Sequence, residues 1–144
     1  MKKVFFDASV LFSALYSQTG ASYKLVQLTE RGYIYGVVTE TIVEELEQNL
    51  RKLKKIDTAD ITHFIVMNRF IVREKVSREE IKPFVAKVHE KDAHVLAAAV
   101  HTGCEYLVTL DKKHLNNEEV RTRVKELHIV SPAEALGILT VQLD

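Results

Sequence analysis

Residues 91–115, KDAHVLAAAVHTGCEYLVTLDKKHL, contain the helix pattern and the strand pattern that decide the fold class. Asp92 can begin a helix, which continues through the small apolar residues 97–100 until Gly103 ends it. Residues 106–110 are then typical of a buried strand, and this strand ends on Asp111. In an open parallel sheet, ligands bind in the crevice beyond the carboxyl ends of the strands. We therefore expect Asp92 and Asp111 to lie at the same edge of a sheet.

The rest of the chain alternates between strand and helix patterns in the same way. The predicted strands are residues 2–6, 33–38, 70–72, 106–110 and 128–130. The predicted helices are residues 8–16 and 21–31, one capped by Thr39, one that Asp57 opens, one at a Ser77–Glu80 capping box, one after Asp92, residues 117–127, and one capped by Ser131. Such alternation favours parallel strands with helices on both faces. We predict one α/β domain over residues 1–144, a three-layer α/β/α sandwich with a central parallel sheet of four or five strands.

The composition bounds the kind of protein that this chain can be. With 144 residues and a hydrophobic fraction of 47%, the chain is long enough for one domain with its own core. It contains no apolar run near the ~20 residues of a membrane span and no signal-peptide pattern, so we expect a cytoplasmic protein without membrane contact. Cys104 is the only cysteine, which excludes an intrachain disulfide. Basic and acidic residues both number 20, so net charge gives no general attraction to nucleic acid.

Acidic residues stand at corresponding places along the predicted elements. Asp7 follows the first predicted strand as Asp111 follows a later one. Glu45 lies in residues 39–50, TETIVEELEQNL, on the same side of the predicted helix as Ile42 and Leu46. A carboxylate so close to a buried face needs a partner. Glu44 instead fits a capping box with Thr41, so we interpret Glu44 as structural.

Taken singly, each acid has a plainer interpretation, because Asp7 and Asp92 could cap helices and Asp111 could belong to a turn. Their convergence at one edge of a sheet is much harder to explain in that way. Two carboxylates ~4 Å apart repel by about 4 kcal/mol at an effective dielectric near 20, so such a group must take up protons or bind cations. Mg²⁺ and Mn²⁺ bind carboxylate oxygens and stabilise the charge that develops on a phosphate. The acids therefore predict a Mg²⁺ or Mn²⁺ site for phosphodiester hydrolysis.

With these residues in view, the sequence resembles the PIN-domain family of metal-dependent ribonucleases, which includes the toxins of VapBC-type toxin–antitoxin pairs. The resemblance is carried by VFFDASVL (residues 4–11), TETIVEEL (39–46), residues 91–115 and IVSPAEAL (129–136). It implies a PIN-like fold and single-stranded RNA as substrate. It further implies a homodimer and an antitoxin protein as partners. The implied catalytic metal ligands are Asp7, Glu45, Asp92 and Asp111.

Further residues near the acids receive supporting roles. The resemblance implies that the hydroxyls of Ser9 and Thr109 orient carboxylates or water. We expect Lys112, Lys113 and His114 to help hold RNA, with His114 contacting phosphate. Because Mg²⁺ and Mn²⁺ prefer oxygen ligands, we interpret the histidines near this edge as surface or turn residues. These are His89, His94, His101 and, as the alternative to its phosphate contact, His114.

Two other functions are compatible with parts of this pattern. The chain could be a catalytically silent PIN-like binding or scaffold module that acts through a protein partner, although the presence of all four acids argues against it. A phosphoryl-transfer domain of the receiver or haloacid-dehalogenase type also places an Asp after its first strand. The dehalogenase type expects a second Asp two residues later, where this chain has Ser9, and a receiver domain expects acids before Asp7, where this chain has KKVFF.

Overall fold

The central feature of the structure is a five-stranded parallel sheet. The computed structural model describes residues 1–53 and 58–142. The sheet has the strand order β3-β2-β1-β4-β5, and every neighbouring pair is parallel. The strands are β1 (Lys3–Phe6), β2 (Tyr35–Thr39), β3 (Ile71–Arg73), β4 (Tyr106–Val108) and β5 (His128–Val130). The predicted α/β fold with a central parallel sheet is thus confirmed, with five strands.

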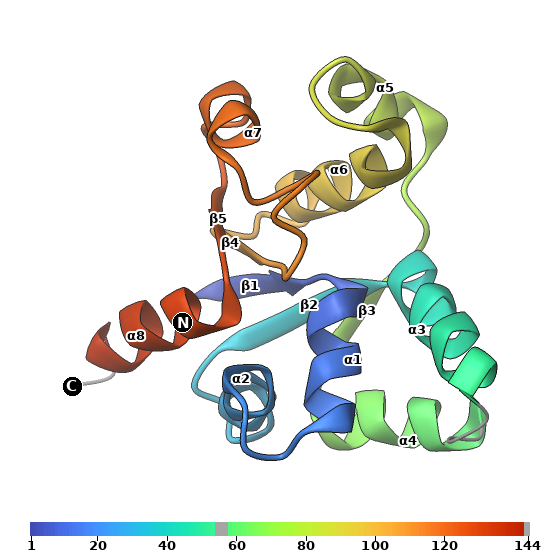
Figure 1. Cartoon of the computed structure of the whole chain (residues 1–144), viewed down its shortest axis with the longest axis vertical. Coiled ribbons are helices and arrows are strands. Elements are labelled where there is room, and N and C mark those ends of the chain that lie inside the picture. The colour runs from blue at the N-terminus through green and yellow to red at the C-terminus, as the bar shows by residue number, and fades with distance from the viewer. Residues whose placement is uncertain (54–57, 143–144) are drawn as a thin grey trace.

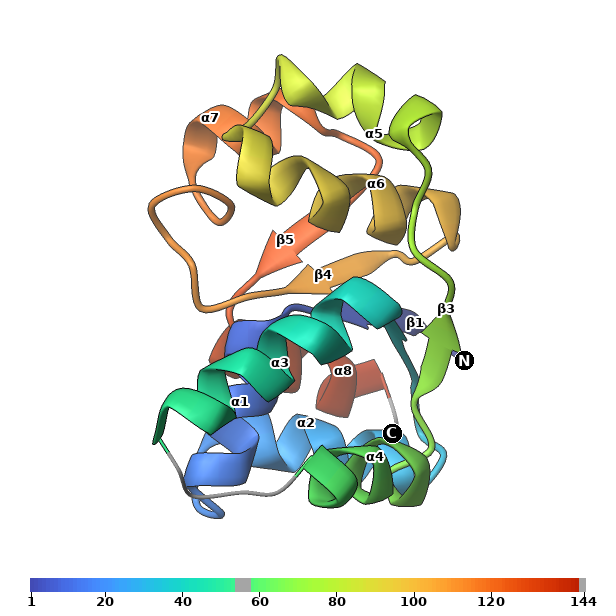
Figure 2. The ribbon, with the colours of Figure 1, turned by 90° about the vertical axis from the view of Figure 1, so that its right-hand side faces the viewer.

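Helices cover both faces of this sheet and make the three layers of the sandwich. Figure 1 and Figure 2 show the helices lying on both sides of the sheet. The first face carries α1 (Ala8–Tyr16), α2 (Ala21–Glu30), α3 (Glu40–Leu53), α4 (Thr58–Met67) and α8 (Pro132–Gln142). The opposite face carries α5 (Arg78–Val85), α6 (Ala93–His101) and α7 (Glu118–Arg123), and the short 3₁₀ helix η1 (Glu90–Asp92) precedes α6. None of the helices that the structure describes combines the length and apolar character needed to cross a membrane.

The core explains why the central strands are almost wholly apolar. Val4, Phe5 and Phe6 of β1 are fully buried, because helices cover both faces of this central strand. Residues 95–99 of α6 are also buried. The three alanines at 97–99 have small side chains and a high helix propensity. Small side chains on α6 therefore let a helix lie close to the sheet next to the acids.

Several of the predicted helix starts are correct, and two details are wrong. Thr39 Oγ1 accepts a hydrogen bond from the backbone N–H of Ile42, and Ser77 and Glu80 form a reciprocal capping box. Because α3 already begins at Glu40, Thr41 lies inside the helix and forms no box with Glu44, which pairs with Lys75 at 2.9 Å. The predicted helix over residues 117–127 is shorter, since α7 ends at Arg123. Asp57, the predicted start of α4, lies outside the described residues.

The strand order places the site. The chain runs outward from β1 through β2 to β3, and then returns to the other side of β1 as β4. The order therefore reverses between β1 and β4, which is where open α/β sheets bind ligands. Asp7 directly follows β1, and Thr109, Leu110 and Asp111 directly follow β4. These two chain segments meet side by side, because the N–H of Asp7 donates to the carbonyl of Val108 at 3.1 Å.

Gly36 in β2 makes a test of how tightly the first face is packed. A Cβ at Gly36 would lie 2.6 Å from Thr29 Cγ2 and 2.8 Å from a ring carbon of Phe70. Gly36→Ala is therefore expected to lower the free energy of unfolding by about 1–3 kcal/mol through overpacking. Gly137→Ala is the matched control, because a Cβ at this position in α8 meets nothing within 4 Å and should add about 0.5–1 kcal/mol of helix stability. Urea unfolding monitored by circular dichroism measures the stability of both variants. Equal urea concentrations at the unfolding midpoints of the two variants would contradict the expectation.

Candidate metal centre

Asp7 is the most buried acid of the site. Its residue is 8% exposed, and its carboxylate is fully engaged by the protein. Oδ1 accepts the backbone N–H of Ala8 at 2.9 Å, so Asp7 does cap α1, as the plainer interpretation held. Oδ2 accepts the hydroxyls of Ser9 at 3.1 Å and Thr109 at 2.7 Å. A helix N-terminus and two hydroxyls thus stabilise a carboxylate that burial would otherwise disfavour.

The two hydroxyls join the ends of β1 and β4. Thr109 Oγ1 donates to Asp7 and also accepts the backbone N–H of Asp111 at 3.1 Å. Ser9 Oγ donates to Asp7 and accepts the backbone N–H of Leu110 at 3.1 Å. Both hydroxyls therefore bridge Asp7 to the segment that carries Asp111. This linkage fixes the two acids relative to each other across the point where the strand order reverses.

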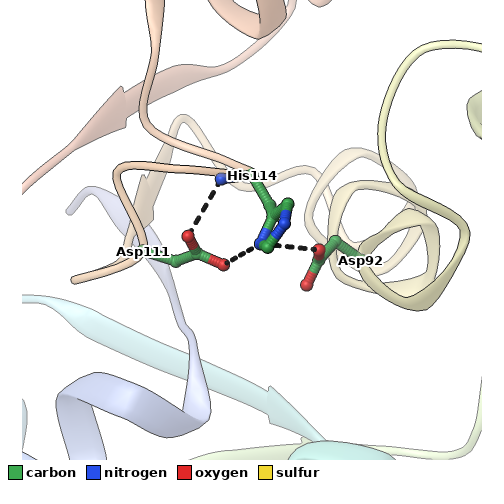
Figure 3. A group of neighbouring side chains, drawn as sticks. All are labelled: Asp92, Asp111 and His114. Atoms are coloured by element: carbon green, nitrogen blue, oxygen red, sulfur yellow. Dashed lines mark hydrogen bonds and ion pairs between the residues drawn. The ribbon is translucent and has the colours of Figure 1, made fainter.

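A second group of side chains lies at the start of α6 and in the loop after β4 (Figure 3). This close group consists of Asp92, Asp111 and His114. One ligand atom from each residue lies within 4.8 Å of the other two. His114 Nδ1 is 3.4 Å from Asp111 Oδ2 and 3.9 Å from Asp92 Oδ2. Asp92 occupies the N-cap position of α6 but makes no side-chain capping hydrogen bond. Capping therefore does not explain Asp92, and its carboxylate is free to face the site.

Glu45 approaches from α3, across the sheet edge from α6. Its Oε1 lies 3.0 Å from His94 Nε2, and its charge contributes to raising the pKa of Asp7. Glu44 is directed instead toward Lys75, so of these two neighbours Glu45 is the one next to the other acids. The His94 side chain is only 16% exposed. The interpretation of His94 as a surface residue is therefore wrong, because it is packed between α6 and Glu45.

Two of the acids have raised pKa values. Burial raises the pKa of Asp7, partly offset by the hydrogen bonds from Thr109 and Ser9. Burial also raises the pKa of Asp92, and the neighbouring charge of Asp111 raises it further. Desolvation and like charge both disfavour the ionised form of a carboxylate. A bound cation would relieve both effects, so this pattern points to a site built for positive charge.

The structure brings the predicted acids to one end of the sheet in two groups. Asp92 and Asp111 lie in the close group with His114, whereas Asp7 and Glu45 lie outside that group. Asp7 is joined to Asp111 through Thr109, and Glu45 to α6 through His94. The Lys112 and Lys113 side chains are exposed next to the close group. His114 lies in a turn as expected, and its contact with RNA phosphate stays a prediction. Sequence reasoning missed the pairing of His94 with Glu45 and the place of His114 beside Asp92, although their spacing of two and three residues from Asp92 and Asp111 was a signal for both.

The donor set fits a hard divalent cation. Carboxylate oxygens are the ligands that Mg²⁺ and Mn²⁺ use in proteins, and the residues present supply several of them within reach of one ion. One oxygen of Asp111, Oδ1, accepts the backbone N–H of His114 at 2.9 Å, which leaves Oδ2 for the site. Asp92 and Asp111 would hold an ion directly. Glu45 lies near enough to Asp7 for its charge to raise the pKa of Asp7.

Three solved structures share this fold. PAE2754 from Pyrobaculum aerophilum is 19% identical, with a TM-score of 0.63 over 97% of this chain and 96% of that chain. A chain of VapBC2 from Rickettsia felis, solved bound to a DNA fragment from their promoter, is 13% identical, with a TM-score of 0.60 over 90% and 98% of the two chains. VapC20 from Mycobacterium tuberculosis, a sarcin-ricin loop cleaving toxin, is 14% identical, with a TM-score of 0.57 over 76% of this chain and 91% of that chain. At such identities the comparison shows the common fold.

The family follows from the sequence match. A comparison with curated protein sequences gave no significant match. Residues 3–113, however, match the family model of the PIN domain. This range begins at β1 and ends beyond Asp111, so it includes all four acids of the site. PIN domains are nucleases that use divalent metal ions. The length of the match and the fold together show that this chain belongs to the PIN-domain family.

Proposed function

We propose that this protein is a metal-dependent endoribonuclease that hydrolyses phosphodiester bonds of single-stranded RNA. The observation that carries the proposal is the placement of acids from four separate segments at the end of the sheet beyond β1 and β4, with Asp92 and Asp111 close together. Asp92 and Asp111 are within reach of a single cation, and Asp7 is linked to Asp111 through one hydroxyl. Carboxylates with raised pKa values in such a crevice are a frequent mark of a functional site.

The proposed mechanism assigns the acids Asp7, Glu45, Asp92 and Asp111 to holding Mg²⁺ or Mn²⁺. The bound ion supplies positive charge that stabilises the phosphate oxygens during hydrolysis and lowers the pKa of a water molecule. Ser9 and Thr109 keep the Asp7 carboxylate oriented through their hydrogen bonds. The amide of His114 does the same for Asp111. The chain thus contributes preorganised carboxylates that would hold the cation where negative charge develops on the phosphate.

RNA would approach over the loop after β4. Lys112 and Lys113 are exposed there, directly after Asp111, and can contact the phosphate backbone. RNA rather than DNA as substrate is supported by the likeness to VapC20, which is described as a sarcin-ricin loop cleaving toxin. Because the contacts offered are to phosphate, binding should weaken as salt rises.

Purified protein tests the proposal directly. A single-stranded RNA with a fluorophore and a quencher at its ends should be cleaved in the presence of Mn²⁺ or Mg²⁺, and EDTA should stop the reaction. A DNA strand of the same sequence should be cleaved much more slowly. Intact RNA under all metal conditions would exclude the nuclease function. If tight binding to a protein partner then remained, the chain would be a PIN-like binding module.

We further propose that the chain is the toxin of a toxin–antitoxin pair. The likeness to VapBC2 and VapC20 supports this role. An open groove of about 690 Å³ between α1 and α3 adjoins the acids, and we propose that an antitoxin segment occupies it. Apolar side chains that include Phe12, Tyr16, Leu53 and Leu110 line the groove. Expression of the wild-type chain in bacteria should stop growth, and an antitoxin encoded beside it should restore growth. Normal growth of cells that accumulate the active enzyme would contradict a toxin role.

We also propose that the protein forms a homodimer. β3 is an edge strand, and an unpaired edge needs cover or charge to prevent association. Apolar side chains are exposed on β3 and on the neighbouring helix α4, namely Val66, Met67, Ile71 and Val72. A second copy that packs on this surface would bury an apolar patch of the kind that marks interaction sites. Sedimentation equilibrium measures the result, and a monomer at high concentration would contradict it.

Thr109 offers a sharp test of how the hydroxyls support the metal centre. Thr109 is 1% exposed, and its hydroxyl bonds both Asp7 and the amide of Asp111. Thr109→Val keeps the shape but removes both hydrogen bonds, so we expect Mn²⁺ affinity to fall about 10–100-fold. Thr109→Ser retains the hydroxyl and should bind Mn²⁺ nearly as wild type. Isothermal titration calorimetry measures both affinities, and equal affinities for Val and Ser would show that the hydroxyl has no role.

A further inference from the structure

His114 lies in the turn after β4, beside the carboxylates of Asp92 and Asp111. Figure 3 shows its imidazole between the carboxylates of Asp92 and Asp111. Its Nδ1 atom lies 3.4 Å from Asp111 Oδ2 and 3.9 Å from Asp92 Oδ2. Two oxygens and one nitrogen thus face the same space from two separate segments, the start of α6 and the loop after β4.

The distances from His114 Nδ1 to the two carboxylates are longer than those of direct hydrogen bonds. A charged N–H···O bond has a donor–acceptor distance of about 2.7–2.9 Å, which is shorter than both. An octahedral ion with metal–ligand distances of about 2.1 Å separates neighbouring ligand atoms by about 3.0 Å and opposite ones by about 4.2 Å. The two measured separations lie between these limits. Neither separation equals an ideal octahedral value, but small side-chain movements would bring this nitrogen and one oxygen of each carboxylate to a shared ion.

The position of His114 is determined by the backbone. Its N–H donates to Asp111 Oδ1 at 2.9 Å, and the N–H of Asn116 donates to the carbonyl of Asp111 at 2.8 Å. The next side chain, Leu115, is fully buried and anchors the loop in the core. The ring of His89 lies 5.1 Å from the ring of His114 on its other side. These contacts hold the imidazole in place before any ion binds.

We propose that His114 Nδ1 is a ligand of the metal centre, and that the centre consequently selects Mn²⁺ and Co²⁺ over Mg²⁺. The inference rests on the proposed metal-dependent function and names the ions that the site prefers. Mg²⁺ demands oxygen ligands in near-ideal octahedral geometry, whereas imidazole suits first-row transition ions. Affinity in mixed nitrogen and oxygen sites rises from Mn²⁺ to Co²⁺. A site of carboxylates alone would discriminate less strongly between Mg²⁺ and these transition ions.

His94 is another histidine near the acids, and its contacts differ. Its Nε2 is paired with Glu45 Oε1 at 3.0 Å, which is the distance of a direct hydrogen bond. This pairing orients Glu45 and occupies the nitrogen that faces it. His94 therefore serves as a positioning residue, and only His114 should contribute nitrogen to the ion.

Metal affinities test the selectivity. Tag-free protein is stripped of metal and titrated in a calorimeter with Mg²⁺, Mn²⁺ and Co²⁺. We expect His114→Ala to weaken Mn²⁺ and Co²⁺ binding at least about tenfold while changing Mg²⁺ binding little. His114→Asn keeps a polar side chain in the loop and gives the same answer if the alanine variant folds poorly. His63→Ala is the matched control, because His63 is exposed on α4.

Spectroscopy on bound Mn²⁺ tests the ligand itself. Electron spin-echo spectra of the wild type and of His63→Ala should show coupling of the ion to a nitrogen nucleus. The coupling should be absent in His114→Ala and should persist in His94→Ala. Coupling that survives in His114→Ala, or that disappears only in His94→Ala, would overturn the proposal. An equal loss of affinity for all three ions in His114→Ala would overturn the selectivity.

These outcomes are separate from those of the nuclease assay. Neither calorimetry nor spin-echo spectroscopy requires RNA. RNA cleavage without nitrogen coupling would leave the nuclease function intact and refute His114 as a ligand. Nitrogen coupling without any cleavage would establish the ligand and refute the nuclease function.

Discussion

Replacing Asp111 by asparagine is expected to lower the rate of RNA cleavage by at least about a thousand-fold, or roughly 4 kcal/mol of transition-state stabilisation. Asn keeps the size of the side chain and can still accept the N–H of His114, which Asp111 now binds at 2.9 Å. It removes the negative charge that holds the cation opposite Asp92. Without a bound cation, neither the phosphate charge nor the attacking water is stabilised. Single-turnover cleavage of the fluorescent RNA in Mn²⁺ measures the loss.

A matched control separates this effect from a general loss of acidic charge. Asp60 is exposed on α4, on the sheet face opposite α6, and Asp60→Asn removes the same charge there. This variant should cleave RNA at the wild-type rate. Circular dichroism establishes that both variants are folded. An Asp111→Asn enzyme with more than a tenth of the wild-type rate would show that the acids are not the catalytic centre.

Replacing Asp92 by asparagine is expected to stabilise the metal-free protein and to abolish its stabilisation by metal. Burial and the charge of Asp111 raise the pKa of Asp92 above the ordinary value of an aspartate. The folded state therefore binds this proton more tightly than the unfolded state, and stability falls as pH rises through that window. At pH 7.5 the ionised Asp92 carboxylate lowers the free energy of unfolding. Asp92→Asn removes this cost, because the amide is neutral. As the pH falls below the raised pKa of Asp92, the difference in stability between the wild type and Asp92→Asn should shrink, because Asp92 of the wild type becomes neutral.

Bound metal should reverse the order of stability of the wild type and Asp92→Asn. A ligand at about a hundred times its Kd stabilises by about 2.7 kcal/mol, which corresponds to a rise in Tm of roughly 5–10 °C for a chain of this size. Wild type in saturating Mn²⁺ should show this rise, whereas Asp92→Asn should show little. Thermal unfolding of both proteins in EDTA and in Mn²⁺ measures these changes in Tm. A wild-type protein that is more stable than Asp92→Asn in EDTA at pH 7.5 would contradict the cost assigned to Asp92.

Local signals in the sequence were sufficient for most of the fold. Thr39, Ser77 and Ser131 cap helices as predicted, because a hydroxyl that accepts a nearby N–H acts over only three residues. The strand patterns around β1 and β4 were strong because helices bury both faces of these strands. Strand ends were less well predicted. The predicted strand continued to residue 110, yet β4 ends at Val108, and Thr109 then bonds Asp7 and Asp111.

Errors arose where a short-range pattern competed with a longer-range contact. Thr41 and Glu44 have capping-box spacing, but Thr39 already caps α3, and Glu44 pairs with Lys75 from beyond β3. The helix expected to continue to residue 127 ends at Arg123, since Val124 leaves helical geometry and is fully buried. His94 was underestimated for the same reason. Its partner, Glu45, lies on α3, which is remote in sequence.

The sequence by itself determined the α/β class, the parallel sheet and the four acids, since alternation of apolar runs, caps and isolated carboxylates are properties of neighbouring residues. Only the tertiary structure decided how these acids group. It placed β4 beside β1, so that one buried hydroxyl joins Asp7 to Asp111, and it set His114 between Asp92 and Asp111. The physical reason is that charge repulsion, burial and ligand spacing depend on distances between segments far apart in the chain, and those distances exist only once the sheet has formed.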